Sequence, residues 1–335
     1  MTAWRPTATL ERLRLRASLL EVVRRYFCEQ QVLEVETPAL SAAAVTDLHL
    51  ASLEVHAMGG TTANRPTPPR YLHTSPEYAM KRLLAAGSGD IWQAARVFRG
   101  EEQSSRHNSE FTLIEWYRIG FSLEALIADI DRLLRRCLAT PLALCGQPLG
   151  PARLLTHRAA FRLHAGVDPQ SATTAELLRA AQQQLGELPA ALANDRDAIL
   201  DLLLGAVVGP RLGFGEVLYL TEWPASQAAL ARLYPAADGV PVAARVEAYV
   251  HGLELCNGFE ELTDAGEQRA RFATDAARRQ AAGRPVPPVD ERFLAALAHG
   301  LPPCSGVAVG FDRVVMLAAG SQDIRDVLAF PAELA

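Results

Sequence analysis

The chain has 335 residues and a formal net charge of −5, with 49% hydrophobic and 21% charged residues. This is the composition of an ordinary globular protein, with enough apolar residues for one large domain or two smaller ones. It excludes a strongly basic protein that binds nucleic acid through a general positive field, but it leaves a local basic patch open. The sequence has no apolar run that would serve as a secretory signal or span a bilayer. We therefore expect a cytoplasmic protein.

The cysteines are dispersed, odd in number and without a Cys-x-x-Cys pair: Cys28, Cys137, Cys145, Cys256 and Cys304. We expect reduced thiols rather than disulfides or a zinc site. Lysine occurs once, at Lys81, and arginine supplies every other basic side chain. We interpret this as compositional bias.

The N-terminal region predicts a helix followed by a strand. Apolar residues from Leu13 to Phe27 recur at helical spacing, so we predict an amphipathic helix over residues 10–30. Residues 31–40 then read as a strand that Pro38 ends.

The next segment predicts a loop and then a short helix. Glycine and proline are dense over residues 59–70, as in a loop between strands. Residues 73–84 read as a strand end that turns into a helix. Ser75 is the expected N-cap, Pro76 suits the first turn, and Glu77 lies near the positive end of the helix dipole.

Residues 96–118 carry the densest chemical pattern, because two alternating runs flank a polar loop crowded with Arg, Glu and His. An antiparallel hairpin would present an arginine, carboxylates and aromatic rings on one face. Those groups could hold a polyphosphate, a purine and an ammonium together. The alternative is a hairpin with a solvated charged face. The residues that share the functional face are Val97, Arg99 and Glu101 on the first run and Phe111, Leu113, Glu115 and Tyr117 on the second.

Residues 123–138 predict a helix, after which the composition changes. Alanine, leucine and glutamine rise over residues 140–215, with helices expected near 173–186 and 195–208. We interpret this stretch as a helical insertion in a single domain that spans residues 1–335.

A second hairpin is predicted from Arg245, with its turn near His251 and Gly252. It would bring Glu247 and Glu254 together on neighbouring strands. Adjacent carboxylates repel unless a cation lies between them, and Mg²⁺ carried by ATP phosphates suits that position. The alternative is a pair of exposed glutamates that form ion pairs with arginines. Helices are expected over residues 264–282 and 290–299.

The C-terminal segment Gly-Val-Ala-Val-Gly-Phe-Asp-Arg begins at Gly306. Its small residues let the backbone approach a flat ring, and Asp312 is expected to cap the following helix. Arg313 would then project from the first helical turn towards the site.

In this order, the segments resemble the three motifs of class II aminoacyl-tRNA synthetases. The helix and strand over residues 10–40 resemble motif 1, the hairpin over 96–118 motif 2, and the run from Gly306 motif 3. The resemblance implies an α+β fold with a mixed, mostly antiparallel sheet flanked by helices, and a homodimer built through motif 1. It implies Arg99 and Arg313 as the catalytic residues and Glu247 and Glu254 as Mg²⁺ ligands. The ATP-binding residues it implies are Arg99, Gly100, Glu101, His107, Asn108, Phe111, Glu254, Leu255, Gly310 and Arg313.

Further segments are similar to the lysyl-tRNA synthetase core, among them Ser-Pro-Glu-Tyr-x-x-Lys-Arg-Leu and Glu-Leu-Cys-Asn-Gly-Phe-x-Glu-Leu. The resemblance implies that Glu77 and Glu115 hold the amino group nearer the reacting carboxylate, and that Glu261 and Tyr117 hold the terminal ammonium. For any one of these residues the alternative is a structural ion pair. The implied amino-acid pocket consists of Ser75, Pro76, Glu77, Glu115, Tyr117, Asn257, Glu261 and Ala308.

The motif 1 segment begins near residue 10, so we expect no anticodon-binding OB-fold of the lysyl-tRNA synthetase kind ahead of it. A synthetase catalytic core without an anticodon-binding domain is similar to the elongation factor P–(R)-β-lysine ligase family. Ala308, where lysyl-tRNA synthetases usually have glycine, could favour a displaced amino group. The resemblance implies activation of (R)-β-lysine or lysine with ATP and transfer to a lysine side chain of elongation factor P, without tRNA. The alternatives are a truncated aminoacylating enzyme and a non-catalytic lysine-binding paralogue.

Overall fold

The centre of the molecule is an eight-stranded mixed sheet, seen in a computed structural model that describes residues 4–56, 68–101, 103–139 and 149–335. The pairs β1–β5 and β7–β8 are parallel and the other neighbours are antiparallel. The expected mixed, mostly antiparallel α+β architecture is therefore confirmed. In spatial order the strands are β1 (Leu33–Glu34), β5 (Ile91–Phe98), β6 (Glu110–Ile119), β14 (Cys304–Gly310), β13 (Leu253–Glu260), β12 (Arg245–Val250), β8 (Leu218–Thr221) and β7 (Arg153–Thr156).

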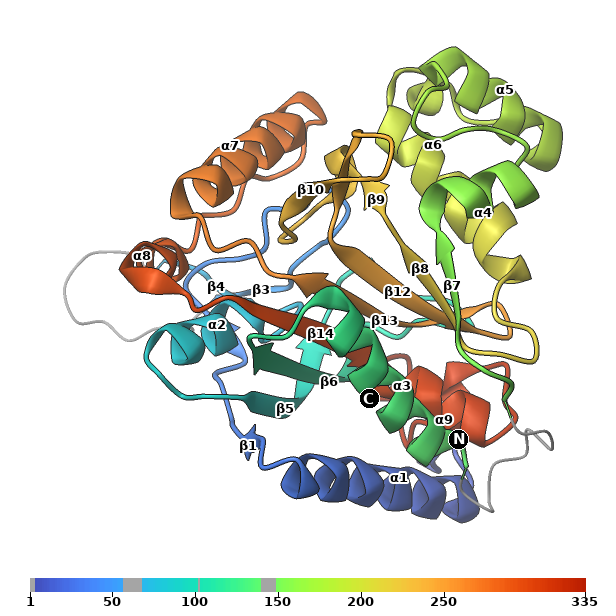
Figure 1. The fold of residues 1–335 in the computed structure, drawn as a ribbon. Helices are drawn as coiled ribbons and strands as arrows, with labels where there is room; N and C mark the ends of the chain where they lie inside the picture. Colours follow the sequence, from blue (N-terminus) through green and yellow to red (C-terminus); the bar gives the residue numbers. More distant parts are fainter. Residues whose placement is uncertain (1–3, 57–67, 102, 140–148) are drawn as a thin grey trace.

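Helices and two small sheets surround this central sheet (Figure 1). The small sheets are β2 (Leu40–Ser41), β4 (Arg70–Leu72) and β3 (Glu54–Val55), and β10 (Leu233–Pro235), β11 (Pro241–Ala243) and β9 (Trp223–Pro224). The helices are α1 (Leu10–Glu29), α2 (Glu77–Ala85), α3 (Leu123–Leu138), α4 (His157–His164), α5 (Thr174–Leu185), α6 (Arg196–Leu203), α7 (Ala265–Ala281), α8 (Glu291–Gly300) and α9 (Phe311–Ala318).

Strand alternation separates the main core from the functional face of the sheet. Trp92 on β5 and Trp116 on β6 point to the side covered by α1, α3 and α9, where Phe27 stacks on Trp92 at 4.8 Å between ring centroids. The neighbouring residues of β6, Glu115 and Tyr117, therefore face the other side. The predicted motif 2 hairpin is confirmed, and its register pairs Val97 with Phe111.

The helix predicted over residues 10–30 is confirmed as α1, and the one over 123–138 as α3. The strand predicted over residues 31–40 is much shorter. Only Leu33–Glu34 pairs with β5, and Leu40–Ser41 joins the small sheet beside β4. The chain leaves one sheet for the other around Pro38, which has no N–H to donate. The loop expected over residues 59–70 lies mostly outside the described residues.

The segment after α3 contains the expected helices α5 and α6, and α6 continues into a π-helical turn at Leu204–Val208. It also contains β7, which the sequence did not indicate and which extends the main sheet beside β8. Figure 1 shows α4–α6 grouped at the upper right, far from α1.

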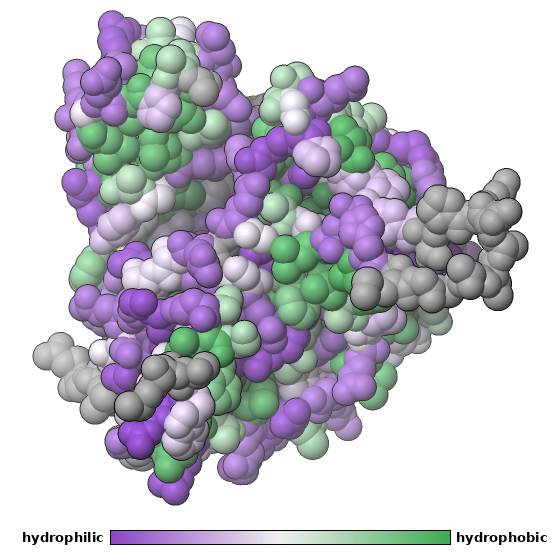
Figure 2. All heavy atoms as spheres, turned by 180° about the vertical axis from the view of Figure 1, so that it is seen from behind, coloured by the Kyte–Doolittle hydropathy of each residue, from purple (hydrophilic) through white to green (hydrophobic). Residues whose placement is uncertain are grey.

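Hydrophilic and hydrophobic residues are interspersed over the rear face of the molecule (Figure 2). No described helix is long and apolar enough to cross a membrane. The described cysteines, Cys28, Cys137, Cys256 and Cys304, are free, and Cys145 lies outside the described residues.

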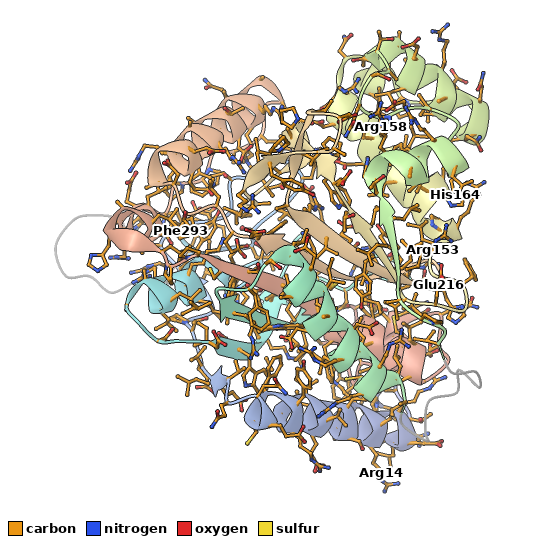
Figure 3. All side chains as sticks on the ribbon, in the orientation of Figure 1. Arg14, Arg153, Arg158, His164, Glu216 and Phe293 are labelled. Carbon is orange, nitrogen blue, oxygen red and sulfur yellow. The ribbon has the colours of Figure 1, made fainter. Side chains whose placement is uncertain are left out.

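One of the smaller hydrophobic cores of the described residues covers the end of the sheet near α2 and α8. Phe293 of α8, labelled in Figure 3, stacks on Tyr78 of α2 at 4.6 Å between ring centroids. Met80 and Leu84 of α2 are buried in the same cluster. This core fixes α2 beside the functional face of the sheet.

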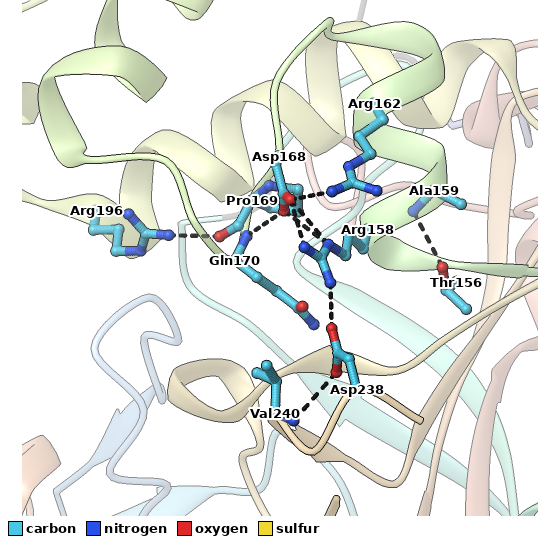
Figure 4. A network of polar contacts seen from close by, with 10 residues as sticks. All are labelled: Thr156, Arg158, Ala159, Arg162, Asp168, Pro169, Gln170, Arg196, Asp238 and Val240. Atoms are coloured by element: carbon cyan, nitrogen blue, oxygen red, sulfur yellow. Dashed lines mark hydrogen bonds and ion pairs between the residues drawn. The ribbon is translucent and has the colours of Figure 1, made fainter. Parts of the chain in front are cut away.

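An arginine–aspartate network fastens the α4–α6 group (Figure 4). Arg158 of α4 pairs with Asp168 at 2.8 Å and with Asp238 of the β10–β11 turn, and Arg162 also pairs with Asp168. Arg196 of α6 donates to the carbonyl of Pro169. The network ties the group to the β10–β11 hairpin, although Arg162 and Asp238 are exposed, so the pairs that contain them add little stability.

Truncating a buried residue of α1 should test the main core. Leu19→Ala removes a fully buried side chain and should lower the free energy of unfolding by about 2–5 kcal/mol. Leu10→Ala, in the same helix at 67% exposure, should change it by less than about 0.5 kcal/mol. Urea unfolding of both variants measures the difference, and equal effects would contradict the packing of α1 described here.

Candidate active site

A cavity of about 870 Å³ lies over the functional face of the sheet, between α2, α7, α8 and the segment 40–47. Most of the predicted site residues line it. They are Ser75, Pro76, Glu77, Arg99, His107, Asn108, Phe111, Glu115, Tyr117, Glu254, Leu255, Asn257, Glu261, Ala308, Gly310 and Arg313. Residues from three distant parts of the chain thus meet in one cavity.

The structure does not bring three predicted site residues into the cavity lining. Gly100 packs against the segment 51–53, and its N–H donates to the carbonyl of Ala51 at 2.8 Å. Glu101 is exposed, and its carboxylate lies 3.2 Å from Arg284. Glu247 is buried beneath the wall on β12.

The two arginines of the motifs lie in the cavity wall with defined partners. The guanidinium of Arg99 lies 5.0 Å from the ring centroid of Phe111. Arg313 donates to the backbone carbonyl of Glu254 at 2.8 Å, and its other Nη lies 2.7 Å from Nε2 of His107. Arg313 thus links the loop of motif 2 to β13.

Asp312 does not cap α9, contrary to the sequence prediction. Gly310 occupies the N-cap position, and Asp312 is buried inside the first turn. Its carboxylate accepts the backbone N–H of Thr112 on β6 at 2.7 Å and pairs with Arg16 of α1. Asp312 therefore fastens the motif 3 helix to the motif 2 strand, beside Arg313.

Asn108 serves as an anchor for the motif 2 loop. Its amide nitrogen donates to the carbonyl of Glu110 at 2.6 Å, and its amide oxygen accepts from Ala332 N near the C-terminus at 2.9 Å. The backbone N–H of Ile324 also donates to the carbonyl of Ser105 at 2.7 Å. The C-terminal segment thus fixes the loop, which no sequence signal indicated.

The predicted hairpin of β12 and β13 is confirmed, and a register shift between Ala248 and Tyr249 places Glu254 opposite Tyr249. Burial and the neighbouring charge of Glu254 raise the pKa of Glu247 to about 7. The two carboxylates are therefore close enough to repel each other. Both oxygens of Glu247 already accept hydrogen bonds at 2.7 Å, from Arg245 and from the hydroxyl of Tyr249.

This donor set fits Mg²⁺ that arrives with nucleotide phosphates. Each carboxylate oxygen retains a second lone pair, and Mg²⁺ is commonly held by one or two carboxylates plus phosphates and water. The described residues contain no cluster of three or more His, Cys, Asp or Glu side chains that would form a complete protein cage. Glu254, with its side chain 40% exposed in the wall and 3.3 Å from Arg313, is the carboxylate of the pair that an incoming ligand could reach.

Three carboxylates meet at the other end of the cavity. Glu115 accepts the hydroxyl of Ser75 at 2.8 Å and that of Tyr117 at 2.7 Å. The Ser75 oxygen also accepts the N–H of Glu77 at 3.0 Å, although the structural N-cap is Pro76 and not Ser75, because α2 begins one residue later than predicted. Ser75 thereby orients the Glu115 carboxylate and connects it to the first turn of α2.

Glu261 supplies a buried acceptor that the described residues leave unused. Its side chain is 1% exposed, and its Oε1 has no hydrogen-bond partner in the part of the chain described. A buried anionic oxygen is costly unless a cation or a donor meets it. A Cβ added at Gly306 would lie 2.7 Å from this Oε1 and 2.2 Å from the Tyr117 ring. Glycine at 306 therefore keeps this end of the cavity open.

Burial is the main cause that raises the pKa of Glu115 and of Glu261, to about 8 in each case. The charge of Glu77 adds to the rise at both residues, while Lys81 lowers it. A pocket of this kind becomes more anionic when an ammonium group enters it.

Sequence reasoning missed two residues that organise the site. Arg245 lies 3.9 Å from the centroid of Trp223, donates to Glu247, and donates to Oδ1 of Asn257 at 3.0 Å. Lys81 lies 2.6 Å from both Glu77 and Glu261. Its helical spacing of four residues from Glu77 was the signal that could have identified it.

Comparison with known proteins assigns the chain to a family. The family model described as tRNA synthetases class II (D, K and N) matches residues 1–334. The elongation factor P–(R)-β-lysine ligase of Sodalis glossinidius is 45% identical over 99% of this chain and 98% of its own length. Ligases of the same name from Hamiltonella defensa and Pectobacterium carotovorum are each 44% identical, over 99% and 100% of this chain and 98% and 99% of their own lengths. The chain therefore belongs to the elongation factor P–(R)-β-lysine ligase family within the class II tRNA synthetases.

Proposed function

We propose that this enzyme activates (R)-β-lysine with ATP and transfers the acyl group to a lysine side chain of elongation factor P. The observation that carries the proposal is one cavity with two guanidiniums at one end and three carboxylates, one with an unpartnered oxygen, at the other. A polyphosphate matches the first end and a diamine matches the second. The names of the relatives support elongation factor P as the acceptor.

The reaction proceeds in two steps. The substrate carboxylate attacks the α-phosphate of ATP, and pyrophosphate leaves. The acceptor amine then attacks the acyl carbon of the adenylate, and AMP leaves. Arg99 stabilises the negative charge that grows on the α-phosphate, and Arg313 holds the γ-phosphate of a bent ATP. Mg²⁺ held by Glu254 and Glu247 would neutralise phosphate charge.

The amino-acid end orients the substrate carboxylate towards the α-phosphate. Glu77 and Glu115 receive the amino group nearer the carboxylate, and Glu261 with Tyr117 receives the terminal ammonium. Phe111 stacks on adenine. The enzyme contributes positioning and charge neutralisation and needs no covalent nucleophile. A homodimer through α1 stays a prediction.

The proposed activation step predicts ATP–pyrophosphate exchange with (R)-β-lysine and weaker exchange with α-lysine. In the second step, folded elongation factor P should gain the mass of one acyl group, and tRNA should not be charged. Isotope exchange and intact-protein mass spectrometry measure the two steps. Exchange with neither isomer would rule out lysine activation, and efficient charging of tRNA would favour the aminoacylating alternative.

Removing the charge of Glu261 should weaken amino-acid binding selectively. Glu261→Gln removes a charge-assisted contact of about 1.5–3 kcal/mol, so the KM for (R)-β-lysine should rise about 10- to 100-fold. The KM for ATP should change less than about 3-fold. Glu260→Gln is the matched control, because Glu260 pairs with Arg232 and does not line the cavity. Equal increases in both KM values would contradict the ammonium-binding role.

The raised pKa values of Glu115 and Glu261 predict a pH-dependent KM. These carboxyls bind an ammonium group only when they are deprotonated, so the KM for (R)-β-lysine should fall as the pH rises from 6 to above 8. It should rise again where the substrate amines lose their protons. Steady-state exchange at a series of pH values, with the KM for ATP as the internal reference, measures this profile. A flat profile between pH 6 and 8.5 would show that neither carboxyl titrates on binding.

A further inference from the structure

The single lysine of the chain lies where the proposed substrate would be held. Lys81 is 1% exposed on α2, and its Nζ lies 2.6 Å from Oε1 of Glu77 and 2.6 Å from Oε2 of Glu261. The ring centroid of Phe293, on α8, lies 5.8 Å from the same Nζ. A buried ammonium with two carboxylate partners and an aromatic neighbour has a fixed position.

Groups from α2, β6, β14 and the residue after β13 determine the electrostatic surroundings of Lys81. The ionisable groups that interact with it are Glu77 on α2, Glu115 on β6, Glu261 after β13, and Cys304 on β14. Burial alone would lower the pKa of Lys81, but the charges of Glu261 and Glu77 outweigh burial and raise it. Lys81 is therefore a permanent cation within the acidic end of the cavity.

We propose that Lys81 is a positioning residue that sets the charge of the amino-acid pocket to match a substrate with two ammonium groups. Its ammonium engages one oxygen of Glu77 and one of Glu261, which leaves Oε1 of Glu261 directed to the ligand. The inference rests on the proposed function, because it concerns how the same pocket recognises a diamine.

Counting formal charges gives the reason for the match. Glu77, Glu115 and Glu261 contribute three negative charges and Lys81 contributes one positive charge, so the ionised pocket carries two negative charges. A diamino acid brings two positive charges outside its reacting carboxylate, and the complex is neutral. Without Lys81 one buried carboxylate would remain uncompensated or would bind a proton.

The same count explains discrimination against amino acids with one amine. A monoamine would leave one carboxylate in the pocket without a cation, which is unfavourable because the desolvated charge is not compensated. A site built around polar partners rejects an analogue that lacks one of them. Lys81 therefore acts on specificity through Glu77 and Glu261 without touching the reacting atoms.

The test is Lys81→Met, which keeps the length of the side chain and removes its charge. Because Lys81 lowers the pKa of Glu115 and Glu261, the falling limb of the KM profile for (R)-β-lysine should move to higher pH by at least about one unit. At pH 7 that KM should rise about 10-fold or more, while the KM for ATP changes less than about 2-fold. Arg25→Met is the matched control, because Arg25 forms an exposed pair with Glu21 at the same four-residue spacing.

An unchanged pH profile in Lys81→Met would overturn the proposal. So would equal increases in both KM values together with a lower melting temperature, since that result describes a purely structural lysine. If exchange fails with both lysine isomers in the natural enzyme, the proposed function itself is wrong and this inference falls with it.

A second measurement uses the natural enzyme and does not depend on the variant folding. Because the chain has one lysine, labelling with ¹³Cε-lysine gives one side-chain resonance. It should not titrate near the ordinary lysine pKa of about 10.4, and it should shift on addition of (R)-β-lysine but not of ATP alone. A resonance that titrates normally, or one unmoved by a diamine that supports exchange, would overturn the role of Lys81 and leave the proposed function standing.

Discussion

Placing three carboxylates in one cavity, two of them buried, is the constraint on which the amino-acid end of this site depends. Each buried charge needs a cation or hydrogen-bond donors, because the fold gains nothing from the carboxylates themselves. Ser75 and Tyr117 supply hydroxyl donors to Glu115, and Lys81 supplies an ammonium to Glu77 and Glu261. In the proposed function, the charge that the protein leaves uncompensated is the charge with which a diamine is recognised.

The register of the antiparallel strands fixes the positions of the side chains in this pocket. Glu115 and Ala308 are direct partners on β6 and β14, and Asn257 on β13 pairs with Ala308 in turn. Side chains at such positions have a fixed spacing, since the opposite face of the same strands is locked into the main core by Trp116 and Val307. Substrate groups therefore meet partners that are already in place, which reduces the ordering cost of binding.

The fold class, the two hairpins and most of the site could be predicted from the sequence, because each depended on local alternation or on a motif. The strand over residues 31–40 was overestimated, since a pattern cannot show that the chain changes sheets at Pro38. Asp312 was misread as a cap because its partners, Arg16 and Thr112, are about 200 or more residues away in sequence. Lys81 was overlooked because its second partner, Glu261, is supplied only by the tertiary fold.

The proposed nucleotide end holds positive side chains in fixed positions, just as the amino-acid end holds negative ones. Arg313 is held by the carbonyl of Glu254 and faces His107, and its helix is fixed through Asp312 to Arg16 and β6. A guanidinium anchored in this way loses little conformational entropy when a phosphate binds. It can therefore stabilise the negative charge that develops during the reaction without first having to be ordered. For the proposed substrate, the opposite polarity of the two ends also fixes the direction in which it binds. A diamino acid that placed its carboxylate among the glutamates would meet like charges there and would leave both of its ammonium groups near the arginines.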